Sequence, residues 1–258
     1  MKPDDINSLI RILQSSHNTV VVTGAGISTE AGIPDFRGKD GIYTKMGGED
    51  KVMALINIDA FRKTPERFYD FHWQRFSYPP IEPSKAHKVL AKMEEDDLIK
   101  GIVTQNIDGL HQKAGGKNVV PIHGNSNEYV CTSCNKIHER EYAITFKPGV
   151  PACAVCGSIL KPNVVLFGES INNYSEAAGL IDHAECLLVI GTSLTVYPLA
   201  GLVQDFSAGA RNLVIINKGP TQLDHVALLK VEVDDGNTLG DILDMTYQGL
   251  TGPSSVTA

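Results

Sequence analysis

The stretch GAGISTEAGIPDFRG, residues 24–38, directly follows the β-branched run TVVVT, residues 19–23. An apolar run of this composition predicts a buried strand. Glycines at a strand end let backbone N–H groups approach a phosphate closely, and the N-terminus of the next helix adds partial positive charge. The sequence therefore predicts a nucleotide site at the end of this strand, in preference to a tight turn with an exposed loop.

This stretch departs from the dinucleotide fingerprint of dehydrogenases. The third glycine of that fingerprint would fall at position 29, where this chain has Thr29. The chain then continues into Pro34, Asp35, Phe36 and Arg37, and not into a long helix with an acidic residue about 20 positions further on. A proline-anchored loop that carries an acid, an aromatic ring and a guanidinium is suited to closing over a ligand.

The 258 residues carry a formal net charge of −7, and 42% of them are hydrophobic. This length predicts either one large α/β domain with an insertion or two unequal domains. The chain lacks the dense Lys/Arg run of a nucleic-acid binder and any apolar run long enough to span a bilayer. Residues 1–16 are patterned as an amphipathic helix, not as a signal peptide. We therefore expect a cytoplasmic protein, monomeric, with neither a nucleic acid nor a membrane as its partner.

Short apolar segments alternate with helical patterns from end to end, with single Gly, Pro or Asn residues at the joins. This alternation predicts an α/β fold with a parallel, doubly wound sheet and crossover helices. The expected strands are residues 19–23, 101–104, 119–122, 161–166, 186–190, 213–217 and 231–233. The expected helices are residues 65–77, 84–95, 107–114, 174–182, 198–208, 221–228 and 236–246.

Two stretches interrupt the alternation. Residues 38–62 begin Gly-rich and are then weakly helical, and residues 128–160 contain cysteines, short strand-like pieces and turns. Both are predicted to be insertions that form a smaller second module. The expected division is a large domain of residues 1–37, 84–127 and 161–258 and a small domain of residues 38–83 and 128–160.

Four of the five cysteines form two Cys-x-x-Cys pairs, Cys131 with Cys134 and Cys153 with Cys156, separated by 18 residues. This spacing is typical of a four-cysteine zinc ribbon, and one Zn²⁺ ion per chain is predicted. Because sulfur would fill all four positions, the ion is expected to be structural. The second matching pair disfavours a redox dithiol, and the lack of a basic helix disfavours DNA contact. His138 is an alternative ligand that four sulfurs make unnecessary.

Hydrogen-bonding side chains follow the expected strand 101–104. Gln105, Asn106 and Asp108 stand where ligands gather in an open parallel sheet, at the carboxyl end of a strand. Such side chains suit a ribose, a carboxamide and an ordered water. Asn106 or Asp108 can equally cap the following helix, and these residues alone leave both interpretations open.

His123 follows the expected strand 119–122 and precedes Gly124. A histidine at a strand end can serve as a general base near neutral pH. Small hydroxyl and amide groups follow two further strands, at residues 191–194 and 217–219, where they can bind ribose hydroxyls. The extended apolar segment 161–169 can pair its backbone with a bound peptide by strand addition.

Together these motifs resemble the sirtuins, the family of NAD-dependent protein-lysine deacylases. The resemblance extends from Thr19 to about Asp235, and the motifs occur in the family's order. They are residues 24–28 (GAGIS), 32–38 (GIPDFRG), 104–108 (TQNID), 123–124 (HG), both Cys-x-x-Cys pairs, 162–165 (PNVV), 167–169 (FGE) and 191–194 (GTSL). This ordered set is far more specific than a lone Gly-x-Gly.

The resemblance implies a Rossmann-like large domain and a small zinc-ribbon and helical module, with NAD and an acetylated-lysine peptide or protein meeting between them. It implies His123 as the catalytic base and Asn106 as the group that orients the ribose or water. The implied NAD contacts are Gly24, Ala25, Gly26, Ser28, Thr29, Pro34, Asp35, Phe36, Arg37, Gln105, Asn106, Ile107 and Asp108, with Gly191, Thr192, Ser193, Asn217 and Asp234 at the adenosine end. The implied peptide contacts are Val165, Phe167, Gly168 and Val196.

The implied reaction removes an acetyl group, or another neutral acyl group, and yields nicotinamide, free lysine and O-acyl-ADP-ribose. The acyl oxygen attacks the ribose carbon that bears nicotinamide, and His123 then deprotonates a ribose hydroxyl. Family members that prefer succinyl or malonyl groups have Tyr-x-x-Arg, whereas here Tyr69 is followed by His72, so a neutral acyl group is expected. Leu166 stands where the family often has an aromatic residue.

Two other functions use the same site. Protein ADP-ribosyl transfer is disfavoured because His123 is retained, and that base is needed only after the acyl oxygen has attacked. An NAD-sensing module without turnover is disfavoured because Asn106, Asp108 and His123 are all intact.

Overall fold

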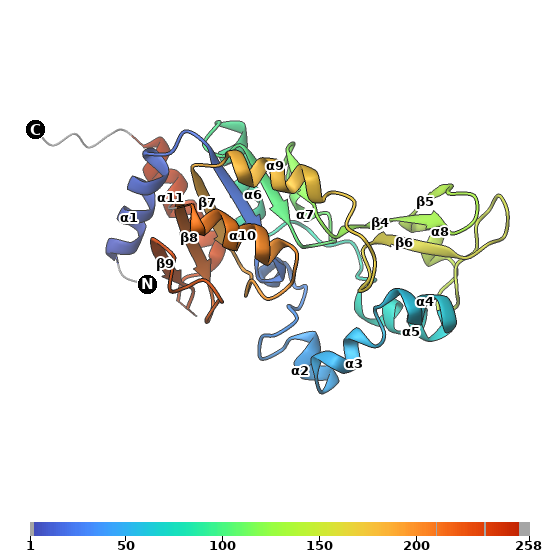
Figure 1. Ribbon diagram of the computed structural model, residues 1–258. Helices are drawn as coiled ribbons and strands as arrows, with labels where there is room; N and C mark the ends of the chain where they lie inside the picture. Colours follow the sequence, from blue (N-terminus) through green and yellow to red (C-terminus); the bar gives the residue numbers. More distant parts are fainter. Residues whose placement is uncertain (1–2, 210, 235, 253–258) are drawn as a thin grey trace, which may run out of the picture.

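The computed structural model describes residues 3–209, 211–234 and 236–252, and most of them surround one parallel sheet (Figure 1). This sheet has six strands in the order β3-β2-β1-β7-β8-β9. Its strands are β1 (Thr19–Thr23), β2 (Gly101–Thr104), β3 (Val119–Pro121), β7 (Cys186–Ile190), β8 (Asn212–Asn217) and β9 (Leu229–Glu232). Every residue of β1 and β7 is buried, as expected for central strands that are covered on both faces. The predicted Rossmann-like α/β architecture is confirmed.

Helices cover both faces of this sheet. On one face, α1 (Pro3–Gln14), α6 (Lys85–Glu95) and α11 (Leu239–Thr251) share a core with Val21. On the other face, α9 (Tyr174–His183) and α10 (Leu199–Ala208) share a core with Val20 and Val22. Successive residues of β1 thus belong to opposite cores, because side chains alternate along a strand.

A second module lies beyond this sheet and is built on three antiparallel strands in the order β5-β4-β6 (Figure 1). The strands are β4 (Gly124–Cys131), β5 (Ile137–Glu139) and β6 (Leu160–Val164). Aromatic residues of α5, among them Phe68 and Tyr69, pack with Tyr129 of β4 in the module's core. Its helices are α2 (Ile42–Met46), α3 (Glu49–Met53), α4 (Ile58–Lys63), α5 (Pro65–Arg75) and α8 (Arg140–Ile144).

Two predicted elements differ from the structure. The sequence places a strand at 161–166 in the alternating series, but β6 pairs antiparallel with β4 and joins the second sheet. The apolar pattern of residues 161–166 is equally consistent with a strand in either sheet. Pairing with β4, which is distant in the sequence, decides which sheet this strand joins. The sequence also predicts a helix over 221–228, where the structure has turns. There the side chain of Thr221 donates to Asp224 at 2.6 Å, which closes a local turn.

The remaining helix predictions hold to within a few residues, including the amphipathic N-terminal helix, of which residues 1–2 lie outside the described residues. Within the described ranges, no helix is both long enough and apolar enough to cross a bilayer. Because β1, β2, β3, β7 and β8 run parallel, the loops that follow them all begin at one edge of the sheet.

Candidate active site

A cavity of about 1670 Å³ lies at this edge of the sheet and is also lined by residues of the second module. Its walls include every residue that the sequence resemblance assigns to NAD or peptide except Gly24. His123 lines the same cavity. The motifs are thus brought together from the loops after the six strands of the parallel sheet and from the segment after β6.

A close approach of two glycine turns forms one wall of the cavity. After β1 the chain enters a short 3₁₀ helix, η1 (Ala25–Ala31), and the N–H of Gly26 donates to the carbonyl of Gly191 at 2.8 Å. A Cβ atom on Gly26 would lie 2.8 Å from the Cα of Gly191, and one on Gly191 would lie 2.6 Å from the nitrogen of Ile27. Gly191 also has a φ of +64°. Only glycine fits these positions, so the two turns can pack directly against each other in the cavity wall.

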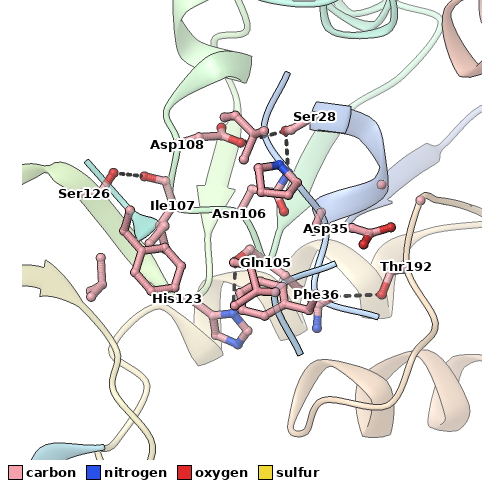
Figure 2. Close-up of a pocket in the computed structure, with 18 of the residues that line it drawn as sticks. Ser28, Asp35, Phe36, Gln105, Asn106, Ile107, Asp108, His123, Ser126 and Thr192 are labelled. Atoms are coloured by element: carbon pink, nitrogen blue, oxygen red, sulfur yellow. Dashed lines mark hydrogen bonds between the residues drawn. The ribbon is translucent and has the colours of Figure 1, made fainter. Parts of the chain in front are cut away.

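Ser28, Asn106 and Asp108 form a hydrogen-bonded group in the same cavity (Figure 2). The amide nitrogen of Asn106 donates to Ser28 Oγ at 3.0 Å and to the carbonyl of Gly24 at 3.1 Å. Ser28 Oγ donates in turn to Asp108 Oδ2 at 2.7 Å. Since the nitrogen of Asn106 is occupied twice, its side-chain oxygen is the atom left for a ligand.

Asp108 combines the two roles that the sequence leaves open. Its Oδ1 accepts from the N–H of Leu110 at 2.9 Å, at the start of α7 (Leu110–Lys113), while the residue lines the cavity. The carboxylate therefore caps the helix from a position in the cavity wall.

The imidazole of His123 is held in one tautomer. Its Nδ1–H donates to the carbonyl of Gln105 at 3.1 Å, so Nε2 carries the lone pair when the ring is neutral (Figure 2). Burial lowers the pKa of His123, and the hydrogen bond to Gln105 only partly opposes this. The side chain of Gln105 accepts from Thr192 Oγ1 at 2.8 Å and ties the β2 loop to the β7 loop. At neutral pH the ring is therefore a neutral base.

Both backbone and side-chain contacts hold the proline-anchored loop: the carbonyls of Asp35 and Phe36 accept from the N–H groups of Ile42 and Tyr43, each at 2.9 Å. Asp35 accepts from a backbone N–H three residues further on, at 2.8 Å. The ring of Phe36 packs on Tyr43 with centroids 5.3 Å apart. Arg37 pairs with Glu49 at 2.6 Å, and both Phe36 and Arg37 line the cavity.

Val165, Phe167 and Gly168 line the cavity from the extended segment after β6, and Val196 lines it from the segment between β7 and α10. The N–H of Phe167 donates to the carbonyl of Ile56 at 3.2 Å, and its carbonyl accepts from Ile58 at 3.0 Å. These bonds occupy the backbone of Phe167, so strand addition has to use other groups of the segment.

Several residues that position this site were not found by sequence reasoning. Ser126 donates to the carbonyl of Ile107 through both its hydroxyl, at 2.7 Å, and its N–H, at 2.9 Å. Lys161 pairs with Glu169 at 2.9 Å and braces the segment that contains Val165, Phe167 and Gly168. Both contacts join residues from different parts of the chain, and no local motif marks Ser126 or Lys161.

The side chains of α5 line the part of the cavity that belongs to the second module. Phe68 and His72 lie in this wall. Burial, with the nearby charges of Lys147 and Arg140, lowers the pKa of His72 to about 3. Its Nε2 lies 2.7 Å from the hydroxyl of Tyr129. The side chain at position 72 in this wall is therefore neutral. The sequence likewise predicts no fixed cation at this position.

The four paired cysteines converge outside this cavity. All four Sγ atoms lie within 4.8 Å of one another, with 3.4 Å between those of Cys131 and Cys156 and 3.7 Å between those of Cys134 and Cys153. A tetrahedral zinc ion with Zn–S bonds of about 2.3 Å requires sulfurs about 3.8 Å apart. The four thiols therefore fit one structural Zn²⁺. His138 lies 3.3 Å from the sulfur of Cys153, outside this set.

Comparison with known proteins gives one consistent family. The Sir2 family model matches residues 24–198. An NAD-dependent protein deacetylase of Clostridium perfringens is 43% identical over 244 residues, which cover 93% of this chain and 99% of that protein. One of Thermotoga maritima is 42% identical over 234 residues, covering 89% of this chain and 93% of that protein.

Solved structures agree with this similarity. A Sir2 complex with p53 peptide and NAD⁺ is 39% identical, with a TM-score of 0.82, and the match covers 96% of this chain and 97% of that one. A Sir2 variant with deacetylated p53 peptide and 3′-O-acetyl-ADP-ribose is 40% identical, with a TM-score of 0.84, covering 94% and 96%.

The cysteine cluster yields a test of the metal site. We expect Cys153→Ser to lose its zinc and to unfold at a lower temperature, because a structural metal contributes folding free energy. Cys186→Ala is the matched control, since Cys186 is a buried thiol of β7 outside the cluster. Metal content by mass spectrometry, with thermal unfolding, checks both variants. Full zinc occupancy in Cys153→Ser would contradict the assignment.

The tautomer of His123 yields a second test. Its pKa should lie below the ordinary value of 6.5, with the proton of the neutral ring on Nδ1. The neutral base should therefore predominate at pH 7 and be lost only as the pH falls below 6.5. Nitrogen-15 NMR titration of the histidine rings measures this, with the urea-unfolded chain as reference. A ring protonated on Nε2 at pH 7, or a pKa at or above 6.5, would refute it.

Proposed function

This chain belongs to the Sir2 family, and we propose that its cavity carries out the NAD-dependent deacetylation of protein lysines. The observation that carries this proposal is the position of His123. Its ring is neutral with the lone pair on Nε2, and it lines the same cavity as the hydrogen-bonded group of Ser28, Asn106 and Asp108. Deacetylation requires a base beside the groups that bind the ribose, because a ribose hydroxyl has to be deprotonated. The chain is thus an enzyme that uses an acetyl-lysine peptide or protein and NAD as substrates.

The residues present fit NAD. The mutual approach of Gly26 and Gly191 leaves no room for a side chain, so backbone groups can meet the phosphates. Thr192, Ser193 and Asn217, with Asp234, would hold the adenosine end. NAD, when bound, supplies a ribose carbon whose bond to nicotinamide can be broken.

Each remaining group of the chain has a role that its contacts support. His123 Nε2 takes a proton from a ribose hydroxyl, because Nδ1 is already committed to Gln105. The side-chain oxygen of Asn106 orients the ribose or a water, because its nitrogen is held by Ser28 and Gly24. Asp108 accepts from the nicotinamide carboxamide. Phe36 and Arg37 close the cavity over the dinucleotide and exclude water that would otherwise compete with the acyl oxygen.

The peptide would lie between the segment of Val165, Phe167 and Gly168 and the segment of Val196, with its acyl-lysine reaching inward. The inner wall there includes Phe68 and the neutral His72. An acetyl group suits this wall, since burying an unpaired carboxylate is unfavourable.

We further propose that the enzyme is a cytoplasmic monomer that binds no nucleic acid. The net charge of −7 supports the absence of a nucleic-acid partner, and the four reduced thiols of the zinc site support the cytoplasmic location. The separate aromatic core of the second module supports a division into a large and a small domain. The small domain extends past the expected residues 38–83 and 128–160, because β4 (Gly124–Cys131) and β6 (Leu160–Val164) pair in the second sheet.

Replacing the base tests the catalytic assignment. His123→Ala should lower kcat for deacetylation by about 10²–10⁴-fold, the usual contribution of a general base. His225→Ala is the control, because His225 is exposed and does not line the cavity. Mass spectrometry of an acetyl-lysine peptide incubated with NAD measures turnover. Turnover of His123→Ala at the rate of the unmodified enzyme would remove His123 from the reaction.

A panel of three peptides tests the acyl preference. The acetyl peptide should be turned over at least about a hundredfold faster than the succinyl peptide, because His72 is neutral. The guanidinium of Arg140, which also lines the cavity, already donates to the carbonyl of Tyr78. The uncharged amide analogue of the succinyl group has the same size and separates charge from volume. It should be turned over faster than the succinyl peptide. Equal or faster turnover of the succinyl peptide relative to the acetyl peptide would overturn the preference.

A further inference from the structure

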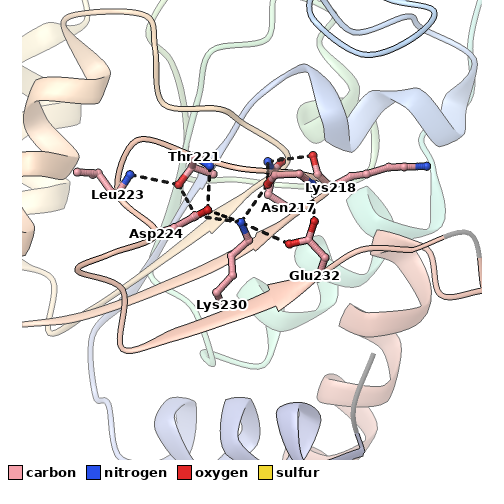
Figure 3. A network of polar contacts seen from close by, with 8 residues as sticks. Asn217, Lys218, Thr221, Leu223, Asp224, Lys230 and Glu232 are labelled. Atoms are coloured by element: carbon pink, nitrogen blue, oxygen red, sulfur yellow. Dashed lines mark hydrogen bonds and ion pairs between the residues drawn. The ribbon is translucent and has the colours of Figure 1, made fainter.

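A half-buried lysine organises the loop at the proposed adenosine end (Figure 3). Lys230 stands on β9, and its Nζ lies 2.9 Å from both carboxylate oxygens of Asp224. The same ammonium donates to the carbonyl of Gly219 at 3.0 Å. The side chains of Lys230 and Asp224 are only 20% and 32% exposed. One cation therefore joins β9 to two points of the loop that follows β8.

Gly219 connects these contacts to the cavity, because its neighbours Lys218 and Pro220 line the cavity wall. Its carbonyl accepts from Lys230 and also from the side-chain amide of Asn217, at 3.1 Å. Its N–H donates to Glu232 Oε1 at 2.6 Å. Lys230 and Glu232 are two residues apart on β9, so their side chains lie on the same face of the strand. They hold the two polar groups of Gly219 at once, and its φ of +84° suits glycine.

Asn217 is the cavity residue that depends on this arrangement. It is 8% exposed and lines the cavity at the end of β8. Its amide nitrogen donates to the carbonyls of Lys218, at 3.3 Å, and Gly219, so the side-chain oxygen is the atom that can accept from a ribose hydroxyl. Because the amide nitrogen of Asn217 is bonded to the carbonyl of Gly219, the position of this carbonyl sets the direction in which the side-chain oxygen of Asn217 points.

Asp224 keeps the cation in place. It accepts from the N–H of Thr221 at 3.0 Å and from the hydroxyl of Thr221 at 2.6 Å. Burial opposes ionisation of Asp224, but the hydrogen bonds from Thr221 and Lys230 outweigh it and lower the pKa of the carboxyl. The carboxyl group of Asp224 is therefore ionised at neutral pH. A fully exposed ion pair of this kind would organise little, whereas this one directs three acceptors of one loop.

We propose that Lys230 is a positioning residue for NAD: through Gly219 it aims the side-chain oxygen of Asn217 at a ribose hydroxyl of the adenosine half. This inference rests on the proposed function. β8 and β2 are separated by β1 and β7 in the sheet, so this loop is remote from the groups that follow β2. Loss of Lys230 therefore weakens dinucleotide binding and leaves the chemical step unchanged.

Lys230→Met tests this, because it keeps the aliphatic length and removes the charge. The KM for NAD should rise about tenfold, as expected for losing a hydrogen bond to a charged group. The kcat and the KM for the peptide should stay within about twofold, because the contacts of His123 and Asn106 are untouched. Lys230→Arg, which can still pair with Asp224, should recover most of the affinity. Asp224→Asn is a second variant and should raise the same KM.

Lys100→Met is the matched control. Lys100 pairs with Asp97 at 2.7 Å, immediately before β2, at the opposite edge of the sheet from the cavity. The KM of the Lys100→Met variant for NAD should match that of the unmodified enzyme.

Calorimetric binding of ADP-ribose, which needs no turnover, separates this inference from the proposed function. The unmodified protein should bind ADP-ribose, and Lys230→Met should bind it about tenfold more weakly. Failure of the unmodified protein to bind would overturn the proposed dinucleotide site itself. Equal binding by Lys230→Met and the unmodified protein would overturn the role of Lys230 alone. A fall in kcat with unchanged KM for NAD would also overturn it, since that indicates a general loss of structure.

Discussion

The in-register parallel pairing of β1 with β2 and β7 is the constraint on which the site depends. It sets Thr23 beside Thr104 on one side and beside Ile190 on the other. The loops that contain the glycine turns, Asn106 and Thr192 therefore begin at the same level. A slip of one residue would exchange the side chains of β1 between the two cores, so the packing of both cores also fixes where the polar loops start.

A chain of buried hydroxyl groups carries this constraint into the site. Thr23 Oγ1 donates to Thr104 Oγ1 at 2.8 Å, and Thr104 Oγ1 accepts from the N–H of Asn106 at 3.1 Å. On the other side, Thr23 Oγ1 lies 2.9 Å from Nε2 of His111. Burial lowers the pKa of His111 to about 3, so the ring stays neutral at this point in the core. Asn106 is thus oriented before any ligand arrives, which reduces the reorganisation that the reaction requires.

The sequence predicts those parts of the protein that short stretches determine by themselves. A β-branched run ending in glycines indicates the first strand and its turn, and two Cys-x-x-Cys pairs indicate a metal site. The partner of β6, the turns at 221–228 and the roles of Phe68 and Lys230 depend on residues far away in the chain. Lys230 acts on Asn217 only because β9 pairs with β8. No pattern within a single segment contains that information.

The central claim is that the dinucleotide is consumed as a reagent, and isotope labelling tests it most directly. Acetyl-lysine peptide and NAD are incubated in ¹⁸O-water, and early products are analysed by mass spectrometry. The account predicts equal amounts of nicotinamide and O-acetyl-ADP-ribose, with the ¹⁸O atom in the acetyl group, because the original amide oxygen stays on the ribose. Labelled free acetate with intact NAD, or formation of NADH, would contradict it.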